Sequence, residues 1–232
     1  MHEWYAAPME GLTGWRWRQV QHEMFGGAAL YVTPFVSPNG NFSFQRKELE
    51  ELDPERNRGI PVVPQILTNR AEYFVWAAKE CRSRGWAQVD LNLGCPSGTV
   101  TGKKKGAGLL RQPELLRQLL DGIFDALPDM KISVKTRIGW ERAEEWPALL
   151  ALLETYPICR LTVHPRVRTQ FYKGTADREV FRWTAEHTAL PLCYNGDVTT
   201  VRDLRELGET FPDDAVMVGR GLVADPSLLR QA

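Results

Sequence analysis

Cys95 stands on a turn that has the features of a catalytic loop. It lies within Asn92–Gly98, where two glycines and a proline restrict the backbone directly after an apolar run. A thiol with a reference pKa of about 8.5 is mostly protonated at neutral pH, so it can serve as a proton donor as readily as a nucleophile. The alternative is a small buried hydrophobe, which is the better interpretation of Cys81, Cys159 and Cys193.

Lys135 and Arg137 have the same parity on one predicted strand, so their side chains project to the same face. A buried lysine needs an anionic partner, because removing its charge from water is costly. A reduced flavin, with negative charge around N1, would supply one, and Asp90 on a neighbouring strand is the alternative. Gln65 and Asn92 could hydrogen-bond the edge of a planar ring, or could satisfy backbone groups of the barrel.

Two glycine-bearing turns, Asn195–Asp197 and Gly219–Gly221, have the composition of a phosphate site. Barrels often bind phosphate with backbone N–H groups from the loops after the seventh and eighth strands, and Arg220 adds a cation there. Either turn alone could be an ordinary strand-to-helix connection, but the pair favours phosphate. His164 ends another predicted strand and could act on a phosphate, a ring or a substrate, or be structural.

Further cations follow these residues along the chain. Lys103–Lys105 come soon after Cys95, and Arg166 and Arg168 follow His164. Solvated surface charge is the usual explanation for such runs. A basic rim around a catalytic mouth, in a chain without net charge, indicates instead an anionic polymer as substrate.

The elements that must position these residues alternate regularly. Runs rich in Val, Ile and Leu alternate with amphipathic stretches of about ten to fifteen residues, which is typical of strand–helix units around a parallel sheet. The predicted strands are Glu3–Ala7, Ala29–Thr33, Pro61–Leu67, Gln88–Leu93, Lys131–Arg137, Arg160–His164, Leu190–Asn195 and Ala215–Gly219. The predicted helices are Arg16–Met24, Arg70–Arg84, Pro113–Ala126, Glu144–Tyr156, Asp177–Glu186 and Thr199–Phe211.

This pattern predicts an α/β fold, a (β/α)₈ TIM barrel over residues 1–232, with an open doubly wound sheet as the weaker alternative. In barrel enzymes the chemistry lies at the C-terminal ends of the strands. Seven of the eight predicted strands end in distinctive functional groups, which favours the barrel.

Composition limits the remaining possibilities. The 232 residues include 29 Lys+Arg and 29 Asp+Glu, which excludes the bulk electrostatics of a histone-like nucleic-acid binder. No apolar run approaches the ~18 residues of a membrane span and no secretory signal is present, so we expect a cytoplasmic protein without membrane contact. The four cysteines form no C-x-x-C pair, so we expect neither disulfides nor a metal site.

The chain resembles the tRNA-dihydrouridine synthases, a family of FMN-dependent (β/α)₈ barrel reductases. The motifs that carry the resemblance occur in family order: Ala7-Pro8-Met9-Glu10-Gly11, Pro64-Gln65-Ile66, Leu91-Asn92-Leu93-Gly94-Cys95-Pro96-Ser97, Val134-Lys135-Thr136-Arg137, His164-Pro165-Arg166, Tyr194-Asn195-Gly196-Asp197 and Gly219-Arg220-Gly221.

The resemblance implies that NADPH reduces a bound FMN, which then gives hydride to C6 of a uracil in tRNA while Cys95 protonates C5. It implies that FMN is bound by Pro8, Met9, Gln65, Lys135, His164, Asn195, Gly196, Asp197, Gly219 and Arg220. At the substrate we expect Asn92, Lys103, Lys104, Lys105, Arg137 and Arg166.

The chain departs from the family pattern in two places. Many members have an aspartate after the threonine of the first motif, whereas Thr13 is followed by Gly14. Members also continue into a full eighth helix and a C-terminal helical RNA-binding domain. Here Asp225–Ala232 supplies about two turns, so we expect a truncated eighth helix and no such domain. The alternatives are an FMN barrel oxidoreductase acting on a small pyrimidine-like molecule, and a catalytically silent flavin- or RNA-binding remnant.

Overall fold

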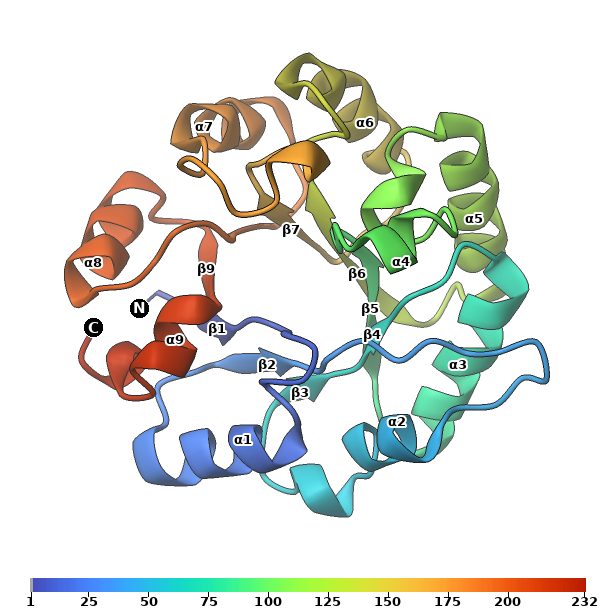
Figure 1. Ribbon diagram of the computed structural model, residues 1–232, viewed down its shortest axis with the longest axis horizontal. Helices are drawn as coiled ribbons and strands as arrows, with labels where there is room; N and C mark the ends of the chain where they lie inside the picture. The colour runs from blue at the N-terminus through green and yellow to red at the C-terminus, as the bar shows by residue number, and fades with distance from the viewer. Residues whose placement is uncertain (1) are drawn as a thin grey trace.

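Nine parallel strands form a nearly closed barrel in the computed structural model, which describes residues 2–232 (Figure 1). Their order around the sheet is β3-β2-β1-β9-β8-β7-β6-β5-β4. The predicted barrel is therefore confirmed. The strands are β1 (Trp4–Ala6), β2 (Leu30–Val32), β3 (Val62–Val63), β4 (Gln65–Ile66), β5 (Gln88–Leu93), β6 (Lys131–Arg137), β7 (Arg160–His164), β8 (Leu192–Tyr194) and β9 (Ala215–Val218).

The number of strands differs from the eight predicted because the third one is divided at Pro64. β3 before the proline pairs with β2, and β4 after it pairs with β5. Proline has no N–H to donate to a neighbouring strand, so the ladder is interrupted there. Val36 continues the β2 side past the break and forms a parallel bridge with Ile66, so the two short strands act as one crossing of the barrel.

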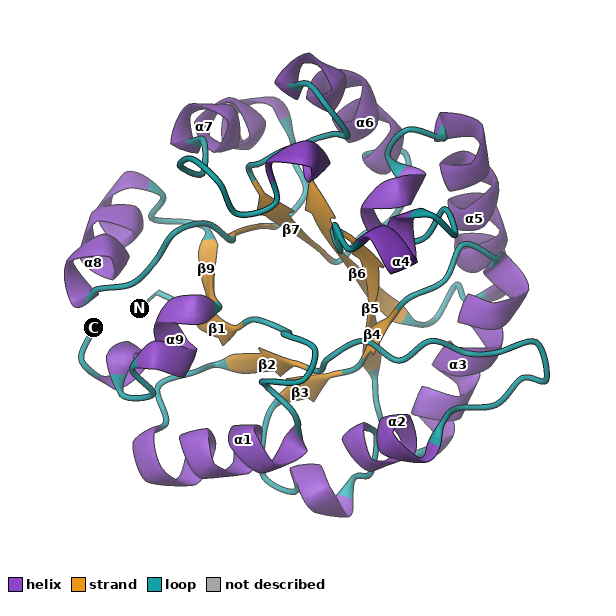
Figure 2. Cartoon of the chain, in the orientation of Figure 1, coloured by secondary structure: helices purple, strands orange, loops and turns teal. Residues whose placement is uncertain are grey.

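Helices surround the strands on the outside of the ring (Figure 2). The six predicted helices are present, Pro113–Ala126 with the predicted ends and the other five with shifted ends, and three short ones were not predicted: α2, α4 and α9. The α-helices are α1 (Trp15–Val20), α2 (Arg46–Glu51), α3 (Ala71–Ser83), α4 (Gly98–Thr101), α5 (Pro113–Ala126), α6 (Trp146–Leu153), α7 (Arg178–His187), α8 (Val201–Thr210) and α9 (Arg220–Ala224). The tighter or wider turns are η1 (Gln21–Phe25), η2 (Glu55–Asn57), η3 (Gly106–Leu109), η4 (Ala143–Glu145), η5 (Arg168–Gln170) and η6 (Leu228–Arg230).

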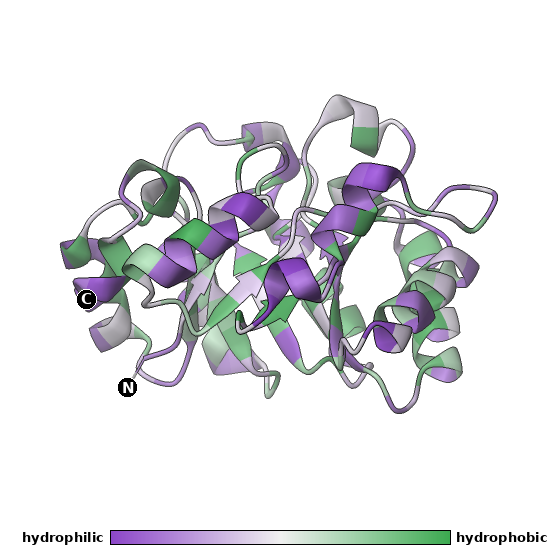
Figure 3. Ribbon diagram, turned by 90° about the horizontal axis from the view of Figure 1, so that it is seen from below, coloured by the Kyte–Doolittle hydropathy of each residue, from purple (hydrophilic) through white to green (hydrophobic). Residues whose placement is uncertain are grey.

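Apolar and polar side chains are segregated in both the helices and the strands. The helices carry both hydrophobic and hydrophilic residues (Figure 3). In α5, the buried residues Leu116, Leu119, Leu120 and Ile123 form an apolar stripe at helical spacing. In β5, Val89, Leu91 and Leu93 are buried in the apolar core. Residues of the opposite parity, Asp90 and Asn92, are buried polar groups that bond other polar side chains. This alternation supplies functional side chains to the interior of the barrel.

The segment 225–232 does not form the two α-helical turns that we expected. Asp225 is extended because it precedes Pro226, and proline disfavours helical geometry in the residue before it. Leu228 and Leu229 in η6 are nevertheless buried, and Gln21 Nε2 donates to the Pro226 carbonyl at 2.9 Å. Across residues 2–232, the structure contains no helix that is both long and apolar enough to cross a membrane.

Candidate active site

A pocket of about 390 Å³ lies at the C-terminal ends of the strands. Its size is within the range of small-molecule and cofactor sites. Among the residues that line it are all ten that were predicted to bind the cofactor, together with Cys95 and three of the six predicted for the substrate. These lining residues are Pro8, Met9, Gln65, Asn92, Cys95, Lys135, Arg137, His164, Arg166, Asn195, Gly196, Asp197, Gly219 and Arg220.

Asp197 lies at the centre of the end of the pocket where a phosphate was expected. One oxygen of this carboxylate pairs with Arg220 at 3.0 Å, and the other pairs with the buried Arg166. Burial acts to raise the pKa of Asp197, but the Arg166 hydrogen bond and the backbone N–H of Ala176 outweigh it and lower that pKa. Two guanidiniums against one carboxylate leave this end of the pocket positive.

His164 is neutral in this surrounding. Burial, followed by the charges of Arg137, Lys135 and Arg166, lowers its pKa well below the ordinary value. Arg166 Nη1 lies 3.0 Å from His164 Nε2. A guanidinium can only donate, so Nε2 must be the acceptor and the ring proton is on Nδ1. The imidazole therefore keeps one N–H that can donate to an anion.

Two glycines at this end have no room for a side chain. A Cβ at Gly196 would lie 2.1 Å from the Tyr194 hydroxyl, and one at Gly221 would lie 2.1 Å from the Val198 carbonyl oxygen. Gly219 stands at the start of α9, directly after β9. Close packing of this kind explains why glycine stands at both positions; the phosphate role of the two turns stays a prediction.

Lys135 forms no direct ion pair with a carboxylate among the described residues. Burial and the nearby Arg137 lower its pKa from 10.5 to about 8, although the charge of Asp90 acts on it and partly opposes this fall. Asp90, the alternative partner, instead accepts hydrogen bonds from Gln65 and Ser133. Among the described residues, no carboxylate oxygen lies within 4.0 Å of Lys135 Nζ. The pocket thus holds an ammonium group that an anionic ligand would stabilise.

Arg137 braces two loops at the mouth of the pocket. Its Nε donates to the Gly94 carbonyl at 3.0 Å and its Nη1 to the Val167 carbonyl at 3.1 Å. Its guanidinium carbon also lies 5.5 Å from the centre of the Tyr172 ring. Arg137 was expected at the substrate, and these contacts show that part of its donor capacity is used on the protein itself.

The Cys95 thiol is partly exposed at the pocket wall. Its turn is held by Asn92, whose Oδ1 accepts from the backbone N–H groups of Gly94 at 3.1 Å and Cys95 at 2.9 Å. Burial raises the pKa of Cys95, although the Ser97 backbone N–H and the charge of Arg137 act in the opposite direction. The neutral thiol, which can donate a proton, is therefore favoured at neutral pH.

The predicted lysines lie outside the pocket. Lys103 and Lys104 are exposed, and Lys105 Nζ donates to Ser37 Oγ at 3.0 Å. Their loop begins just after α4, which directly follows the cysteine turn, so they are placed beside the mouth rather than within it.

Aromatic residues beside the same turn were not predicted from the sequence, whereas Arg168 was expected in a basic rim. Arg168 Nε donates to the Pro96 carbonyl at 3.1 Å, and its guanidinium covers Trp140 at 4.6 Å from the ring centre. Arg111 lies at 4.3 Å from that ring. Tyr172, which lines the pocket, lies 4.9 Å from the guanidinium of Arg220. Neither Trp140 nor Tyr172 belongs to a motif. The only signal for them in the sequence was the weak one given by the basic residues nearby.

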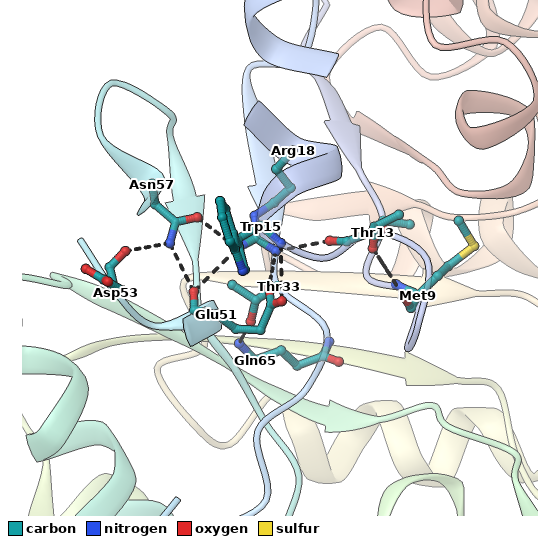
Figure 4. Close-up of polar contacts among 10 residues, drawn as sticks. Met9, Thr13, Trp15, Arg18, Thr33, Glu51, Asp53, Asn57 and Gln65 are labelled. Carbon is teal, nitrogen blue, oxygen red and sulfur yellow. Dashed lines mark hydrogen bonds and ion pairs between the residues drawn. The ribbon is translucent and has the colours of Figure 1, made fainter. Parts of the chain in front are cut away.

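Gly14, where many family members have aspartate, is compensated from α2. Glu51 Oε1 accepts from the backbone N–H of Trp15 at 3.2 Å, and Glu51 Oε2 pairs with the buried Arg18 at 2.8 Å. Arg18 also donates to the Thr13 carbonyl at 3.0 Å (Figure 4). A carboxylate is thus present at the start of α1, although it comes from a different element.

Thr13 links this cluster to the pocket. Its hydroxyl accepts a hydrogen bond from the backbone N–H of Met9 at 2.8 Å (Figure 4). Met9 lines the pocket. The buried guanidinium behind the β1–α1 loop therefore helps to determine the shape of the pocket wall.

Comparisons with known proteins show which family the chain resembles. Residues 5–232 match the family model described as dihydrouridine synthase (Dus). A probable tRNA-dihydrouridine synthase of Rhizobium leguminosarum is 33% identical over 221 residues, which cover 95% of this chain and 68% of that protein. One of Rickettsia conorii is 30% identical over 226 residues, covering 97% and 67% respectively. The chain thus spans about two thirds of the length of these relatives.

Solved structures resemble the barrel more distantly. Histamine dehydrogenase from Rhizobium sp. 4-9 has a TM-score of 0.72 and 13% identity, with 99% of this chain and 45% of that chain covered. At this identity the likeness supports the fold alone. The family match rests on nearly the whole sequence, from the first strand to the last helical turn, and the chain belongs to the dihydrouridine synthase family.

Proposed function

We propose that this protein reduces uridine to 5,6-dihydrouridine in tRNA, with FMN as cofactor and NADPH as reductant. The observation that carries the proposal is the Cys95 thiol in the wall of a cationic pocket at the C-terminal strand ends, in a chain of this family. The net reaction adds one hydride and one proton across the C5–C6 bond of uracil and oxidises NADPH to NADP⁺.

The pocket residues fit the two parts of FMN that carry negative charge. The neutral His164, Arg220 and the turns Asn195–Asp197 and Gly219–Gly221 offer donors for the phosphate. Lys135, for which the described residues supply no direct ion pair, would stand beside the ring. Pro8, Met9 and Gln65 line the same wall. When bound, FMN supplies the hydride that is added to C6.

Cys95 donates the proton to C5 in this proposal. Its raised pKa keeps the thiol protonated at neutral pH, and the Asn92 hydrogen bonds hold its turn in one position. General acid catalysis by a positioned group is worth typically ~10²–10⁴-fold in rate. The thiolate then regains its proton from solvent, to which the residue is partly exposed.

The groups around the mouth fit a tRNA substrate. Arg137 and Arg166 supply positive charge to the pocket while they hold its loops, and Asn92 holds the cysteine turn. In this proposal the exposed Lys103 and Lys104 bind phosphates of the RNA backbone.

The test is to purify the protein, record its flavin spectrum after dialysis against FMN, and supply NADPH with tRNA that lacks dihydrouridine. Mass spectrometry of the digested tRNA should detect dihydrouridine. Cys95→Ala should leave reduction of the flavin by NADPH unchanged and slow dihydrouridine formation by ~10²–10⁴-fold. Cys159 is partly exposed outside the pocket, so the expectation that it is a buried hydrophobe was wrong for this thiol. Cys159→Ala is therefore the matched control and should change neither rate.

Two results would overturn the proposal. A protein that remains colourless after dialysis against FMN has no flavin site. An undiminished single-turnover yield in Cys95→Ala removes that thiol from the reaction.

A further inference from the structure

Asp90 is a buried carboxylate that is not part of the pocket wall. It is 2% exposed, and it accepts hydrogen bonds from Ser133 Oγ at 2.7 Å and Gln65 Nε2 at 2.8 Å. Burial raises its pKa to about 6, so the group is mainly ionised at neutral pH and both oxygens act as acceptors. Burying a carboxylate is costly, which makes its partners informative.

Two amide side chains connect Asp90 to the cysteine turn. Gln65 Oε1 accepts from Asn92 Nδ2 at 2.7 Å. Asn92 Oδ1 in turn accepts from the backbone N–H groups of Gly94 and Cys95. The side chains come from the adjacent strands β4 and β5, and all three are buried. The result is a continuous chain of hydrogen bonds from Asp90 to the turn that carries Cys95.

The Asp90 carboxylate and the backbone N–H groups of the turn fix the direction of these hydrogen bonds. An amide can point either way, because its oxygen accepts and its nitrogen donates. The Asp90 carboxylate can only accept, so Gln65 must present its NH₂ group to it. The backbone N–H groups of the turn can only donate, so Asn92 must present its oxygen to them. One arrangement of the two amides satisfies both ends, and it is the one observed.

We propose that Asp90 is a positioning residue for the Cys95 turn. It orients the amide of Gln65, which orients that of Asn92, and the Asn92 oxygen then holds the turn. The value of this positioning for proton donation rests on the proposed function, whereas the positioning itself can be measured without any reaction.

Reversing the direction of these hydrogen bonds by substitution provides a sharp test. In Asn92→Asp, residue 92 can no longer donate to Gln65 Oε1, so one hydrogen bond of the chain is broken. In Asp90→Asn with Asn92→Asp, the amide introduced at position 90 can donate to Gln65 Oε1. Gln65 can then turn its NH₂ toward the carboxylate at position 92, and that carboxylate can still accept from the turn. The Ser133 hydroxyl can continue to donate to the side chain at position 90.

A third variant separates hydrogen-bond direction from charge. Asp90→Leu with Asn92→Asp removes the same carboxylate as the rescuing pair but supplies no donor to Gln65. If relief of charge repulsion alone were responsible, this variant would be rescued equally.

The readout is amide hydrogen exchange of the Gly94–Cys95 peptide, measured by mass spectrometry on the full chain, with the α8 peptide as an internal reference for global opening. Loss of one buried hydrogen bond should make exchange about tenfold faster in Asn92→Asp. The double variant with Asn at position 90 should return to within about threefold of wild type, and the one with Leu should not. In the wild-type background, Asp90→Leu should accelerate exchange and Asp90→Asn, which keeps an acceptor toward Gln65, should not.

Equal exchange in the Asn and Leu variants at position 90, in either background, would overturn the proposal. Dihydrouridine formation in single turnover should follow the same order as exchange. If exchange is rescued but the wild type forms no dihydrouridine, the positioning stands and the proposed function fails. If the wild type is active but exchange is not rescued, the proposed function stands and the positioning fails.

Discussion

Binding of reduced FMN should depend on pH through Lys135. Burial and Arg137 lower the pKa of this lysine from 10.5 to about 8 in the free protein, a cost of about 3 kcal/mol to its charged form. An anionic ring beside the ammonium stabilises that charged form and raises the pKa again. Binding therefore takes up a proton wherever Lys135 is neutral beforehand, and the affinity falls as the pH rises above about 8.

The size of the loss of affinity follows from the pKa of Lys135 in the free protein. Well above this pKa each pH unit lowers the affinity by up to tenfold, so between pH 7 and 9.5 the loss should reach roughly 30-fold, or about 2 kcal/mol. Below the pKa the affinity should be constant with respect to this group. The affinity continues to fall only until the pH reaches the pKa of Lys135 in the complex.

The assay is anaerobic ultrafiltration of dithionite-reduced FMN with the protein between pH 7 and 9.5, with flavin quantified after reoxidation. Lys135→Met should bind more weakly at pH 7 and lack the fall above pH 8. Cys95→Ala should retain the fall, which separates the lysine from the thiol that also titrates in alkaline solution. A wild-type affinity that is flat to pH 9.5, or an equal fall in Lys135→Met, would refute the reasoning.

Three further predictions address stability and RNA binding. Arg18→Met should lower the free energy of unfolding in urea by about 3–5 kcal/mol, because the buried Thr13 carbonyl, the buried Asn57 Oδ1 and the partly buried Glu51 carboxylate all lose their donor. Arg16→Met, on the exposed side of α1, should stay within about 0.5 kcal/mol. The folded-state pKa of His164 is far below 6.5, so its contribution to stability is fully present above pH 6.5 and is lost as the pH falls toward the folded value. The stability advantage of wild type over His164→Asn should shrink by up to about 1.4 kcal/mol per pH unit in that window. Replacing Lys103–Lys105 with alanine should reduce the log–log salt slope of tRNA binding by roughly 0.7–0.9 for each phosphate that a lysine no longer neutralises, while Lys131→Ala, at the opposite end of a barrel strand, should leave it unchanged.

Periodicity and strand-end composition were enough to predict the barrel and the residues that gather at its mouth. Lys135 and Arg137 share a parity, and the structure places both in the pocket wall. The division of the third strand also had a signal in the sequence, because Pro64 stands inside the apolar run. Local rules of this kind succeed when the period of the strand decides which way a side chain points.

The hydrogen-bond partners could not be predicted in the same way. Arg166 was expected at the substrate, and its guanidinium is engaged by Asp197 and the carbonyls of Lys173 and Gly174. Whether a buried guanidinium has free donors depends on the path of loops that sequence patterns do not describe. The same holds for Asp90, whose link to Gln65 depends on the register of β4 against β5.

Gly14 illustrates why a motif is better interpreted together with the structure around it. A missing aspartate suggests a lost function if only the motif is considered. In the fold, a Cβ at Gly14 would lie 3.0 Å from Glu51 Oε1, so the carboxylate from α2 already occupies the space beside this position. That helix lies in a stretch where the sequence predicted no element, and its carboxylate holds both the first amide of α1 and the buried Arg18. The charge that the β1–α1 loop needs is therefore supplied from another segment, because burial of Arg18 requires an anion nearby, whichever part of the chain provides it.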